Sequence, residues 1–507
     1  MVKRSGGALL LSLHIDRESG RLVTSQVFTA IRDIILSGGL SAGERLPASR
    51  TLAKDLGISR TTVIEVFERL AAEGLIESRT GAGTFVSEAL RDNRPAVPPP
   101  PAGPEDQQTS KPRLSRSITK ASEMFFERLP HEPRAFTTAM PAFDAFPLAL
   151  WSRQMSKHWR DQRNIVMGYS DPHGYFPLRR AIASHLRANR GIACEPEQIF
   201  IVGGAQQAFY LIGSVLLDPN DKVWFENPGA IGARNSLVAC GAKLIPVPVD
   251  DGGIMVEDGL HLAPDFRLAF VTPAHQQPLG STMTLERRFA LLKAAEEADA
   301  LIIEDDYDGE FCYGGHPQPT LKSVDATGRV IYVGTFSKTL FPALRLGYFL
   351  SPPALVEVFN KVTNAFVQGV PSSNQAVVAS FMEEGHFAAH LRRMRKIYAE
   401  RHQVLCDSAK AHLDGLLEVV PTDTGLHTIG LLPKSILEDS AAAAAREQGI
   451  TVTPIERFSI APTHGNGLVL GFSGITPPEI VAGVKTLGRV LEKLKQQPRA
   501  TAAHGMV

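Results

Sequence analysis

A run of prolines between Pro95 and Pro104 prevents this chain from forming one continuous core. Proline fixes φ and has no backbone N–H, so the run cannot join a helix or a sheet ladder. We predict a semi-rigid, solvated linker at residues 91–114. It separates an N-terminal unit, residues 1–90, from a longer C-terminal part that we expect to end in a flexible tail, residues 497–507.

Composition limits where the protein acts and how it meets partners. The 53 basic and 53 acidic side chains cancel, so any binding of DNA has to be local. The cysteines show no CxxC spacing, which argues against a disulfide scaffold or a zinc site and predicts no metal. No apolar run reaches the roughly 18 residues that span a bilayer. The stretch from Ala8 to Leu13 is interrupted too early for a signal peptide. We therefore expect a cytoplasmic protein.

The N-terminal unit shows the element order of a winged helix. Apolar residues at helical spacing predict a helix over residues 23–36, and a second helix is expected over 49–56. Gly57 supplies a turn, and Ser59 can cap a third helix. Two short strands, 75–79 and 83–86, flank a turn at residues 80–82. This order predicts a winged helix-turn-helix.

Several polar residues lie where a winged helix meets DNA. The third helix begins Ser59-Arg60-Thr61-Thr62, which places an arginine fork and hydroxyl groups at the end that enters a major groove. Arg50 is placed to contact the DNA backbone, and Gly81 allows the wing to approach it. Residues 20–90 also hold eight basic and eight acidic side chains, a balance that equally fits a neutral protein-interaction module.

The whole module resembles the GntR family of bacterial regulators. The matching strings are Gly43–Arg50, Leu56–Val63, Leu70–Gly74 and Gly81–Val86. The resemblance implies that operator DNA is contacted by Arg50, Ser59, Arg60, Thr61, Thr62 and Gly81.

Beyond the linker, strand-like apolar segments alternate with amphipathic helices, which indicates an α/β fold. Polar groups directly follow five of the segments, at 199–202, 223–225, 268–271, 301–303 and 330–333. In open α/β sheets the carboxyl ends of the strands form the ligand crevice. We therefore expect these polar groups to meet at one site.

The groups at these strand ends suit an aldehyde cofactor that carries a phosphate. Lys338 offers an amine for a Schiff base, and Asp305 a carboxylate for a protonated pyridine nitrogen. Tyr307 offers a donor for a phenolic ring oxygen. A phosphate needs backbone amides at a helix start, a hydroxyl group and an arginine. The sequence supplies these groups at Gly204-Ala205-Gln206, at Thr335 or Ser337, and at Arg345.

Each of these residues also has an ordinary explanation. Lys338 alone fits a solvated side chain, and Asp305 alone fits a helix cap. Tyr307 fits the core, and Arg345 fits an edge strand. Their joint placement at successive strand ends favours a cofactor site.

Residues from about 143 to 494 resemble fold-type I pyridoxal-phosphate enzymes, specifically the aminotransferase-like part of MocR regulators. The matching motifs are Tyr169–Tyr175, Gly203–Gln207, Glu304–Asp308 and Gly334–Lys338 with Arg345–Tyr348. The resemblance implies pyridoxal 5'-phosphate with Lys338 as the catalytic lysine, bound also by Asp305, Tyr307, Arg345, Thr335, Ser337, Ala205, Gln206 and Gln277. It further implies a large domain at 115–380, a small domain at 381–496 and a head-to-tail homodimer.

Two positions depart from the family's pattern. Ala230 stands where the family has an aromatic residue that stacks on the cofactor ring, and Val469 fills the slot of an arginine that binds the substrate carboxylate. His275 is a candidate for the ring packing, and Arg457 for the carboxylate. Ordinary transamination is therefore less expected.

Three functions stay open at this point. The first is a transcription regulator whose operator affinity depends on pyridoxal phosphate, or on an amine or amino acid that reacts with it. The second is an aminotransferase with an accessory DNA-binding domain. The third is a regulator whose degenerate pocket binds a metabolite without pyridoxal phosphate. The retained Lys338, Asp305, Tyr307 and Arg345 favour the first.

Overall fold

The computed structural model describes residues 20–79, 81–90, 114–125, 133–314, 318–463 and 465–496, together with residues 10, 13 and 15–17. The chain forms two compact units, residues 1–112 and 113–507. Apart from Leu114, the predicted linker lies outside the described residues, as does the predicted tail. None of the described helices is both long and apolar enough to cross a membrane.

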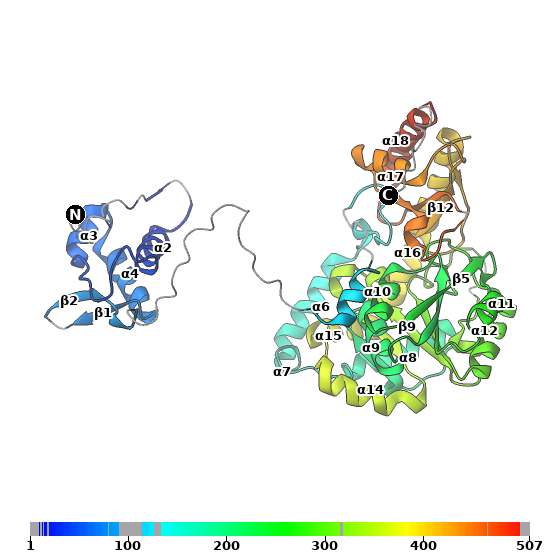
Figure 1. Cartoon of the computed structure of the whole chain (residues 1–507), viewed down its shortest axis with the longest axis horizontal. Coiled ribbons are helices and arrows are strands. Elements are labelled where there is room, and N and C mark those ends of the chain that lie inside the picture. Colours follow the sequence, from blue (N-terminus) through cyan, green and yellow to red (C-terminus); the bar gives the residue numbers. More distant parts are fainter. Residues whose placement is uncertain are drawn as a thin grey trace. The chain divides into compact units, whose positions relative to one another are not determined.

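The N-terminal unit packs three helices with a two-stranded antiparallel hairpin (Figure 1). Its elements are α2 (Val23–Leu36), α3 (Ser49–Leu56), α4 (Arg60–Ala72), β1 (Ile76–Arg79) and β2 (Gly83–Val86). Gly57 ends α3 with a φ of 62°, a left-handed conformation that lets the chain turn directly into α4. Buried apolar side chains from α2 and α4, among them Ile31, Val63 and Val66, form the core of this unit.

The C-terminal unit is built on an eight-stranded sheet of order β3-β10-β9-β8-β7-β4-β5-β6. Its strands are β3 (Ile199–Val202), β4 (Lys222–Asn227), β5 (Lys243–Asp250), β6 (Gly253–Ile254), β7 (Leu268–Val271), β8 (Leu301–Asp306), β9 (Val330–Thr335) and β10 (Gly347–Leu350). Strands β9, β8, β7, β4 and β5 run parallel, whereas β10 is antiparallel to both β3 and β9. The residues that follow β4, β7, β8 and β9 therefore meet at one edge of the sheet.

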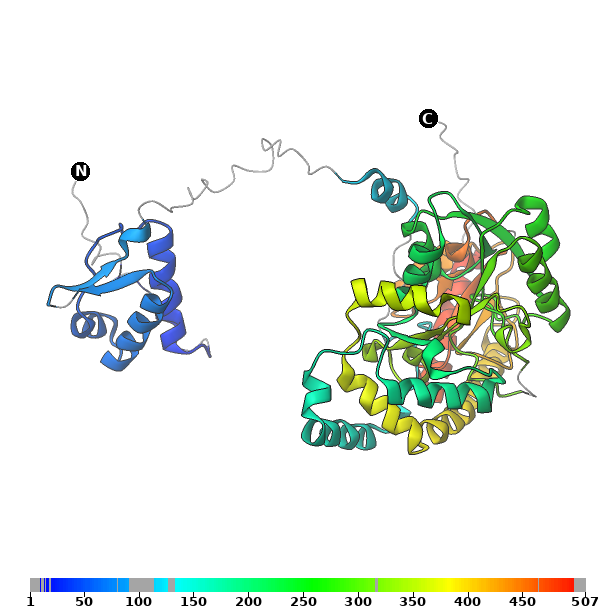
Figure 2. The same cartoon turned by 90° about the horizontal axis from the view of Figure 1, so that it is seen from below.

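Helices cover both faces of this sheet (Figures 1 and 2). Phe225 and Ile303 belong to a buried cluster on the face covered by α9 (Ala205–Leu216) and α10 (Ile231–Ala239). Trp224 and Ile302 point to the opposite face, because side chains alternate along a strand. The other main helices of this region are α5 (Arg116–Ser122), α6 (Leu148–Asp161), α7 (Arg163–Met167), α8 (Phe176–Arg190), α11 (Val256–Leu262), α12 (Leu285–Glu297), α13 (Phe336–Thr339), α14 (Val356–Val362) and α15 (Ser372–Glu383).

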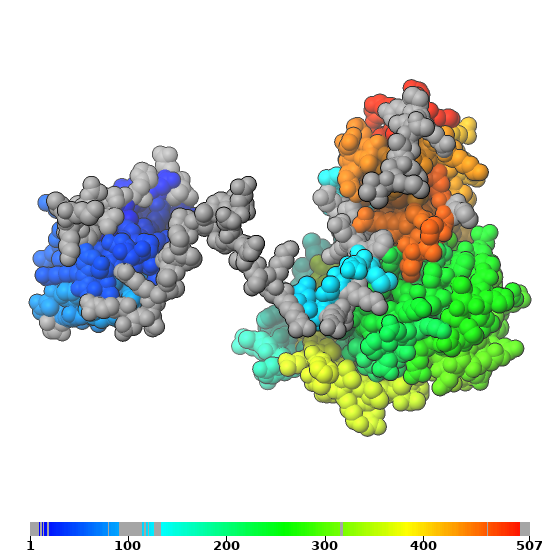
Figure 3. Space-filling view, viewed as in Figure 1, coloured from blue at the N-terminus to red at the C-terminus, as the bar shows by residue number. Residues whose placement is uncertain are grey.

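A four-stranded antiparallel sheet of order β11-β12-β14-β13 forms the second layer of this unit. Its elements are β11 (Glu418–Val419), β12 (His427–Leu431), β13 (Thr453–Pro454) and β14 (Gly467–Gly471), with α16 (His386–His412), α17 (Glu438–Glu447) and α18 (Pro477–Gln496). The orange and red elements lie at one end of the unit, and in the space-filling view the orange region adjoins the green region of the large sheet (Figures 1 and 3).

A segment that precedes the large sheet in sequence pairs with the small sheet in space. Ala135 forms a β-bridge with Ile450, and Phe136 forms one with Gly471 of β14. The segment thus links the two layers. The boundaries at 115–380 and 381–496 stay predictions.

Candidate functional sites

Lys338 lies at the carboxyl edge of the large sheet, in the single helical turn α13 that follows β9. Its Nζ donates a hydrogen bond to the carbonyl of Ala139 at 3.1 Å. Ala139 belongs to the segment that pairs with the small sheet. The amine therefore lies at the junction of the two layers.

Asp305 presents a buried carboxyl group near this amine. It is 5% exposed, and its Oδ1 has no hydrogen-bond partner among the described residues. Burial raises the pKa of Asp305 well above its usual range; the charges of Asp306 and Asp308 add to the rise, and the charge of Lys338 opposes it. A buried polar atom without a partner carries a desolvation penalty. This oxygen fits a ligand that brings an N–H group, as a protonated pyridine nitrogen does.

Tyr307 is held by a histidine and an aspartate. The phenol oxygen lies 3.0 Å from His275 Nδ1, and the same nitrogen lies 2.9 Å from Asp308 Oδ2. Burial raises the pKa of Tyr307 well above its ordinary value, so the phenol keeps its proton. His427 of β12 packs against His275 with 4.7 Å between ring centroids. Burial lowers the pKa of His427 to about 3, and its Nε2–H donates to the Pro278 carbonyl at 3.1 Å.

Sequence reasoning did not assign Asp308 and His427 to the site. Asp308 belongs to the motif Glu304–Asp308, but it lies beyond the end of β8, so alternation along the strand does not place it beside His275. His427 carried no local signal. It enters the site only because the small sheet packs against the large one.

The groups predicted for a phosphate lie where β3, β10 and β9 adjoin. Gly347 of β10 pairs with Val202 on one side and with Thr335 on the other. A Cβ atom placed on Gly204 would lie 3.7 Å from Arg345 Nη1, so the guanidinium group lies beside the start of α9. The first N–H groups of a helix, here at Ala205 and Gln206, have no intrahelical acceptor. Guanidinium and N–H groups together can hold an anion.

Fewer contacts define the positions of Thr335, Ser337 and Gln277, which are also predicted to bind the cofactor. Thr335 accepts a hydrogen bond from the Ser337 N–H at 3.1 Å and thereby caps α13. The side chain of Ser337 is half-buried, as is that of Gln277. The Gln277 N–H donates to Thr272 Oγ1 at 3.0 Å.

Glu226 fixes the loop that carries His275 and Gln277. It is fully buried and accepts hydrogen bonds from Thr272 N at 3.2 Å, Thr272 Oγ1 at 2.6 Å and Gln276 Nε2 at 3.2 Å. Burial raises the pKa of Glu226 to about 7. Glu226 therefore anchors the loop through a carboxyl group that is inaccessible to solvent.

The two positions that depart from the family's pattern are both buried. Ala230 is the N-cap residue of α10 and is 4% exposed. Val469 lies in β14 within an apolar cluster that also contains Ile231, Ile429, Ile455 and Phe458. Arg457 lies in the short turn Ile455–Phe458 beside this cluster. A stacking role for His275 stays a prediction.

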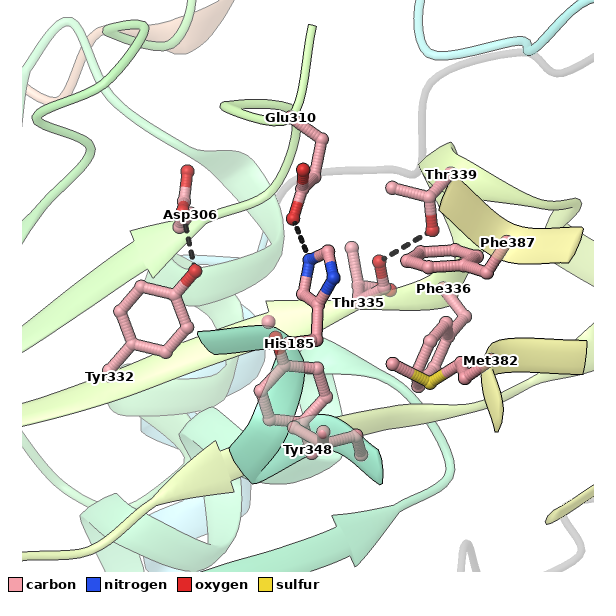
Figure 4. A pocket seen from close by; sticks show the side chains of 12 residues that line it. His185, Asp306, Glu310, Tyr332, Thr335, Phe336, Thr339, Tyr348, Met382 and Phe387 are labelled. Atoms are coloured by element: carbon pink, nitrogen blue, oxygen red, sulfur yellow. Dashed lines mark hydrogen bonds and ion pairs between the residues drawn. The ribbon is translucent and has the colours of Figure 1, made fainter. Parts of the chain in front are cut away.

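A separate cavity lies on the other side of β8 (Figure 4). Asp306, which points away from the Asp305 side, faces it and is paired with Arg190 and Tyr332. His185 and Glu310, which also line the cavity, contact each other at 2.5 Å. The cavity holds about 20 Å³, which is room for about one water molecule. It is far too small for a cofactor.

Four of the predicted DNA-contacting residues, Ser59 to Thr62, lie at the start of α4, whereas Arg50 lies in α3 and Gly81 in the turn of the hairpin. Ser59 Oγ accepts from the Thr62 N–H at 3.0 Å, so this hydroxyl caps the helix, and it lies 2.8 Å from Thr62 Oγ1. Arg50, Arg60 and Thr61 are exposed, and Thr62 is half-buried. Gly81 has a φ of 77° in the turn of the hairpin, where a side chain would strain the backbone. The start of α4 thus offers the guanidinium group of Arg60 at a helix N-terminus, and α3 offers the exposed guanidinium group of Arg50.

Comparison with known proteins gives the same division of the chain. Residues 23–86 match the model of the bacterial regulatory proteins of the gntR family, and residues 145–469 match that of the class I and II aminotransferases. The probable rhizopine catabolism regulatory protein MocR of Rhizobium meliloti is 38% identical, over 97% of this chain and 99% of its own length. The chain belongs to the MocR family of transcription regulators.

Other relatives and solved structures agree with this membership. The pyridoxine biosynthesis transcriptional regulator PdxR of Corynebacterium glutamicum is 30% identical, over 89% of this chain and 92% of its own. The α-aminoadipate aminotransferase LysN of Thermus thermophilus, solved with N-(5'-phosphopyridoxyl)-L-leucine, is 26% identical with a TM-score of 0.67, over 75% of this chain and 99% of that one. The predicted fold, a GntR-type helix-turn-helix unit followed by a fold-type I aminotransferase-like region, is confirmed.

Proposed function

We propose that this MocR-family regulator binds operator DNA with its winged helix and pyridoxal 5'-phosphate at the junction of its two sheets. A primary amine, an amino acid or the cofactor itself then alters its occupancy of DNA. In this proposal the DNA contacts are Arg50, Ser59, Arg60, Thr61, Thr62 and Gly81. A homodimer is part of the proposal, because regulators of this class read paired half-sites.

The observation that carries the cofactor half of the proposal is the buried, unpartnered Oδ1 of Asp305. An acid in this position is costly to the protein alone, and a ligand with an N–H group removes the cost. Lys338 is close enough to lower the pKa of Asp305 electrostatically. One amine and one acid are thus available to opposite ends of the same small ring.

The chain's other groups have distinct parts in holding the cofactor. Tyr307, protonated and fixed by His275, would donate to the ring oxygen. Arg345 and the N–H groups of Ala205 and Gln206 would bind the phosphate, with Thr335 and Ser337, and Gln277 would contact the ring. When bound, pyridoxal phosphate supplies an aldehyde that condenses reversibly with primary amines. That reversible chemistry is what a sensor of amines needs.

Steady transamination receives no comparable support. It requires recognition of two carboxylate substrates, and Val469 with its apolar neighbours occupies the position expected of the carboxylate-binding arginine. The regulator proposal needs no turnover.

Borohydride trapping tests the cofactor half of the proposal. Full-length protein incubated with pyridoxal phosphate, reduced and digested should carry the added mass on the peptide that contains Lys338. The matched Lys338→Ala protein should carry none. Retention of a labelled fragment from upstream of the protein's own gene tests the DNA half. Native, folded protein that traps no cofactor and retards no DNA would remove the proposal.

A further inference from the structure

We propose that the effector of this site is a primary amine that bears no carboxylate next to its amine carbon. It would lie against an uncharged wall made by β12, β14 and the turn Ile455–Phe458. The inference rests on the proposed function, because it places the cofactor at Lys338.

The wall is connected to the amine of Lys338 through the segment that contains Ala139. The amine donates to the Ala139 carbonyl, at 3.1 Å. The segment that contains Ala139 is fastened to β14 and the residues after it: the Gly471 N–H donates to the Phe136 carbonyl at 3.0 Å, and Ser473 Oγ donates to the Met140 carbonyl at 2.6 Å. The end of β14 is therefore hydrogen-bonded to the same backbone segment that accepts the hydrogen bond from the Lys338 amine.

Alternate side chains of β14 point toward the junction of the two sheets. Leu468 and Leu470 enter the main core, so Val469 and Gly471 point to the other face. On the neighbouring strand β12, His427 pairs with Gly471, and Ile429 pairs with Val469. On this face Val469 and Ile429 present apolar side chains, and Gly471 presents none. The remaining side chain, the imidazole of His427, donates to a carbonyl.

The large-sheet and small-sheet sides of the junction present different kinds of side chain. Asp305, Asp308 and Glu226 lie on the large-sheet side and are all buried, and these acidic side chains offer a carboxylate no cationic partner. On the small-sheet side Val469 is 1% exposed among isoleucine and phenylalanine side chains. A carboxylate placed against this wall would lose its water without gaining a donor.

Three guanidinium groups, those of Arg234, Arg345 and Arg457, are candidates to replace the arginine that is missing at Val469. Arg234 of α10 is 5% exposed and donates to the Ser459 carbonyl at 2.9 Å, so it serves the turn and not a ligand. Arg345 lies at Gly204, on the phosphate side. Arg457 has an interaction within the chain, while its buried Nε hydrogen-bonds to no described residue, so it is the arginine that the variants below test directly. The geometry therefore points to a ligand that needs no carboxylate anchor.

Matched pairs of small amines test the inference with the full-length protein loaded with pyridoxal phosphate. We choose 2-phenylethylamine against L-phenylalanine and butylamine against L-norvaline, because each pair differs only in the carboxylate. The readout is the change in the visible spectrum of the bound cofactor, plotted against the concentration of unprotonated amine. We expect half-saturation by each amine at a concentration at least about tenfold lower than by its amino acid, since no charge-assisted hydrogen bond offsets carboxylate desolvation. Equal or tighter binding of the amino acids would overturn the inference.

Two variants identify the source of any selectivity. Val469→Arg should move the preference toward the amino acids, and Arg457→Gln should leave the preference of the native protein unchanged. If Arg457→Gln instead weakens only the amino acids about tenfold, Arg457 is a carboxylate anchor and the inference is wrong. A cofactor spectrum that responds to neither member of a pair also contradicts the inference, whereas absence of any bound cofactor contradicts the proposed function beneath it.

Discussion

The imidazole of His275 meets the phenol of Tyr307 with 3.0 Å between Nδ1 and the hydroxyl oxygen. The same Nδ1 lies 2.9 Å from Asp308 Oδ2, which also accepts the Leu426 N–H at 3.2 Å. An Nδ1–H shared between the carboxylate and the phenol oxygen leaves the phenol's own hydrogen free. His275 thus aims the hydroxyl hydrogen of Tyr307 away from the protein and toward the proposed ring oxygen of the cofactor.

Replacing His275 with Phe should therefore act like replacing Tyr307 with Phe. Phenol donation stabilises the ionised ring oxygen, so its loss should raise the pH midpoint of the bound cofactor's visible spectrum by about one unit, the size expected for a hydrogen bond to a charged group. A spectrophotometric pH titration of both single variants and the double variant measures this. The double variant should shift no further than Tyr307→Phe alone. A His275→Phe protein that titrates like the native protein, beside a shifted Tyr307→Phe, would contradict the positioning role.

The neighbouring residues Asp305 and Asp306 should behave in opposite ways. Asp305→Asn removes a buried acid whose Oδ1 has no hydrogen-bond partner among the described residues. The change should lower cofactor affinity at least about tenfold and leave the free energy of unfolding of the cofactor-free protein little changed. Asp306→Asn breaks a buried ion pair with Arg190, at a cost of about 3–5 kcal/mol in the free energy of unfolding. Cofactor retention and urea unfolding, followed by tryptophan fluorescence, separate the two effects. Loss of stability in the Asp305 variant alone would reverse the assignment.

Two exposed arginines, Arg60 at the start of α4 and Arg50 near the start of α3, should dominate DNA binding. Arg60→Ala should weaken operator binding by about 1–3 kcal/mol if it reads a base, and Arg50→Ala should lower the salt slope by about one if it contacts a phosphate. Fluorescence anisotropy of labelled operator DNA at several salt concentrations measures both. The matched control is Arg69→Met, because Arg69 lies over the Phe28 ring at 4.1 Å and belongs to the last turn of α4. An equal loss in all three variants would argue against the proposed groove contact.

Acid should destabilise the C-terminal unit through His427. Its pKa falls from 6.5 to about 3 in the folded protein because of burial, so the neutral form stabilises the fold above pH 6.5. That contribution is lost as the pH falls from 6.5 toward 3, by about 1.4 kcal/mol per pH unit. His427→Asn keeps a donor for the Pro278 carbonyl and removes the titration. Urea unfolding by tryptophan fluorescence reports this unit, which contains Trp151, Trp159 and Trp224. Parallel losses of stability in native and variant protein between pH 6 and pH 4 would refute the effect.

Local signals account for the elements that sequence reasoning placed closely. Helix α2 covers the predicted residues 23–36 because its apolar residues recur at helical spacing. Helix α3 ends at Gly57, which takes the left-handed conformation that glycine favours. Strands β2, β3 and β7 coincide with the segments predicted for them.

Strands β8 and β9 run further than the sequence indicated. Local patterning ended β8 at Ile303, because three acids follow, yet the strand continues to Asp306. Glu304 and Asp306 are tolerated there because distant groups contact them: the Leu321 and Lys322 N–H groups donate to Glu304 at 2.8 and 2.7 Å, and Arg190 pairs with Asp306. Such partners are invisible to a local pattern. The same holds for His427, whose place beside His275 follows from the packing of two sheets.

Occupancy of the cofactor site should change the affinity of the same chain for DNA. Fluorescence anisotropy of operator DNA with full-length protein, measured with and without pyridoxal phosphate and an added amine, tests it most directly. The dissociation constant should change by at least about fivefold, and Lys338→Ala should bind DNA with no such change. An identical dissociation constant under all conditions, for native protein that demonstrably carries the cofactor, would contradict the claim.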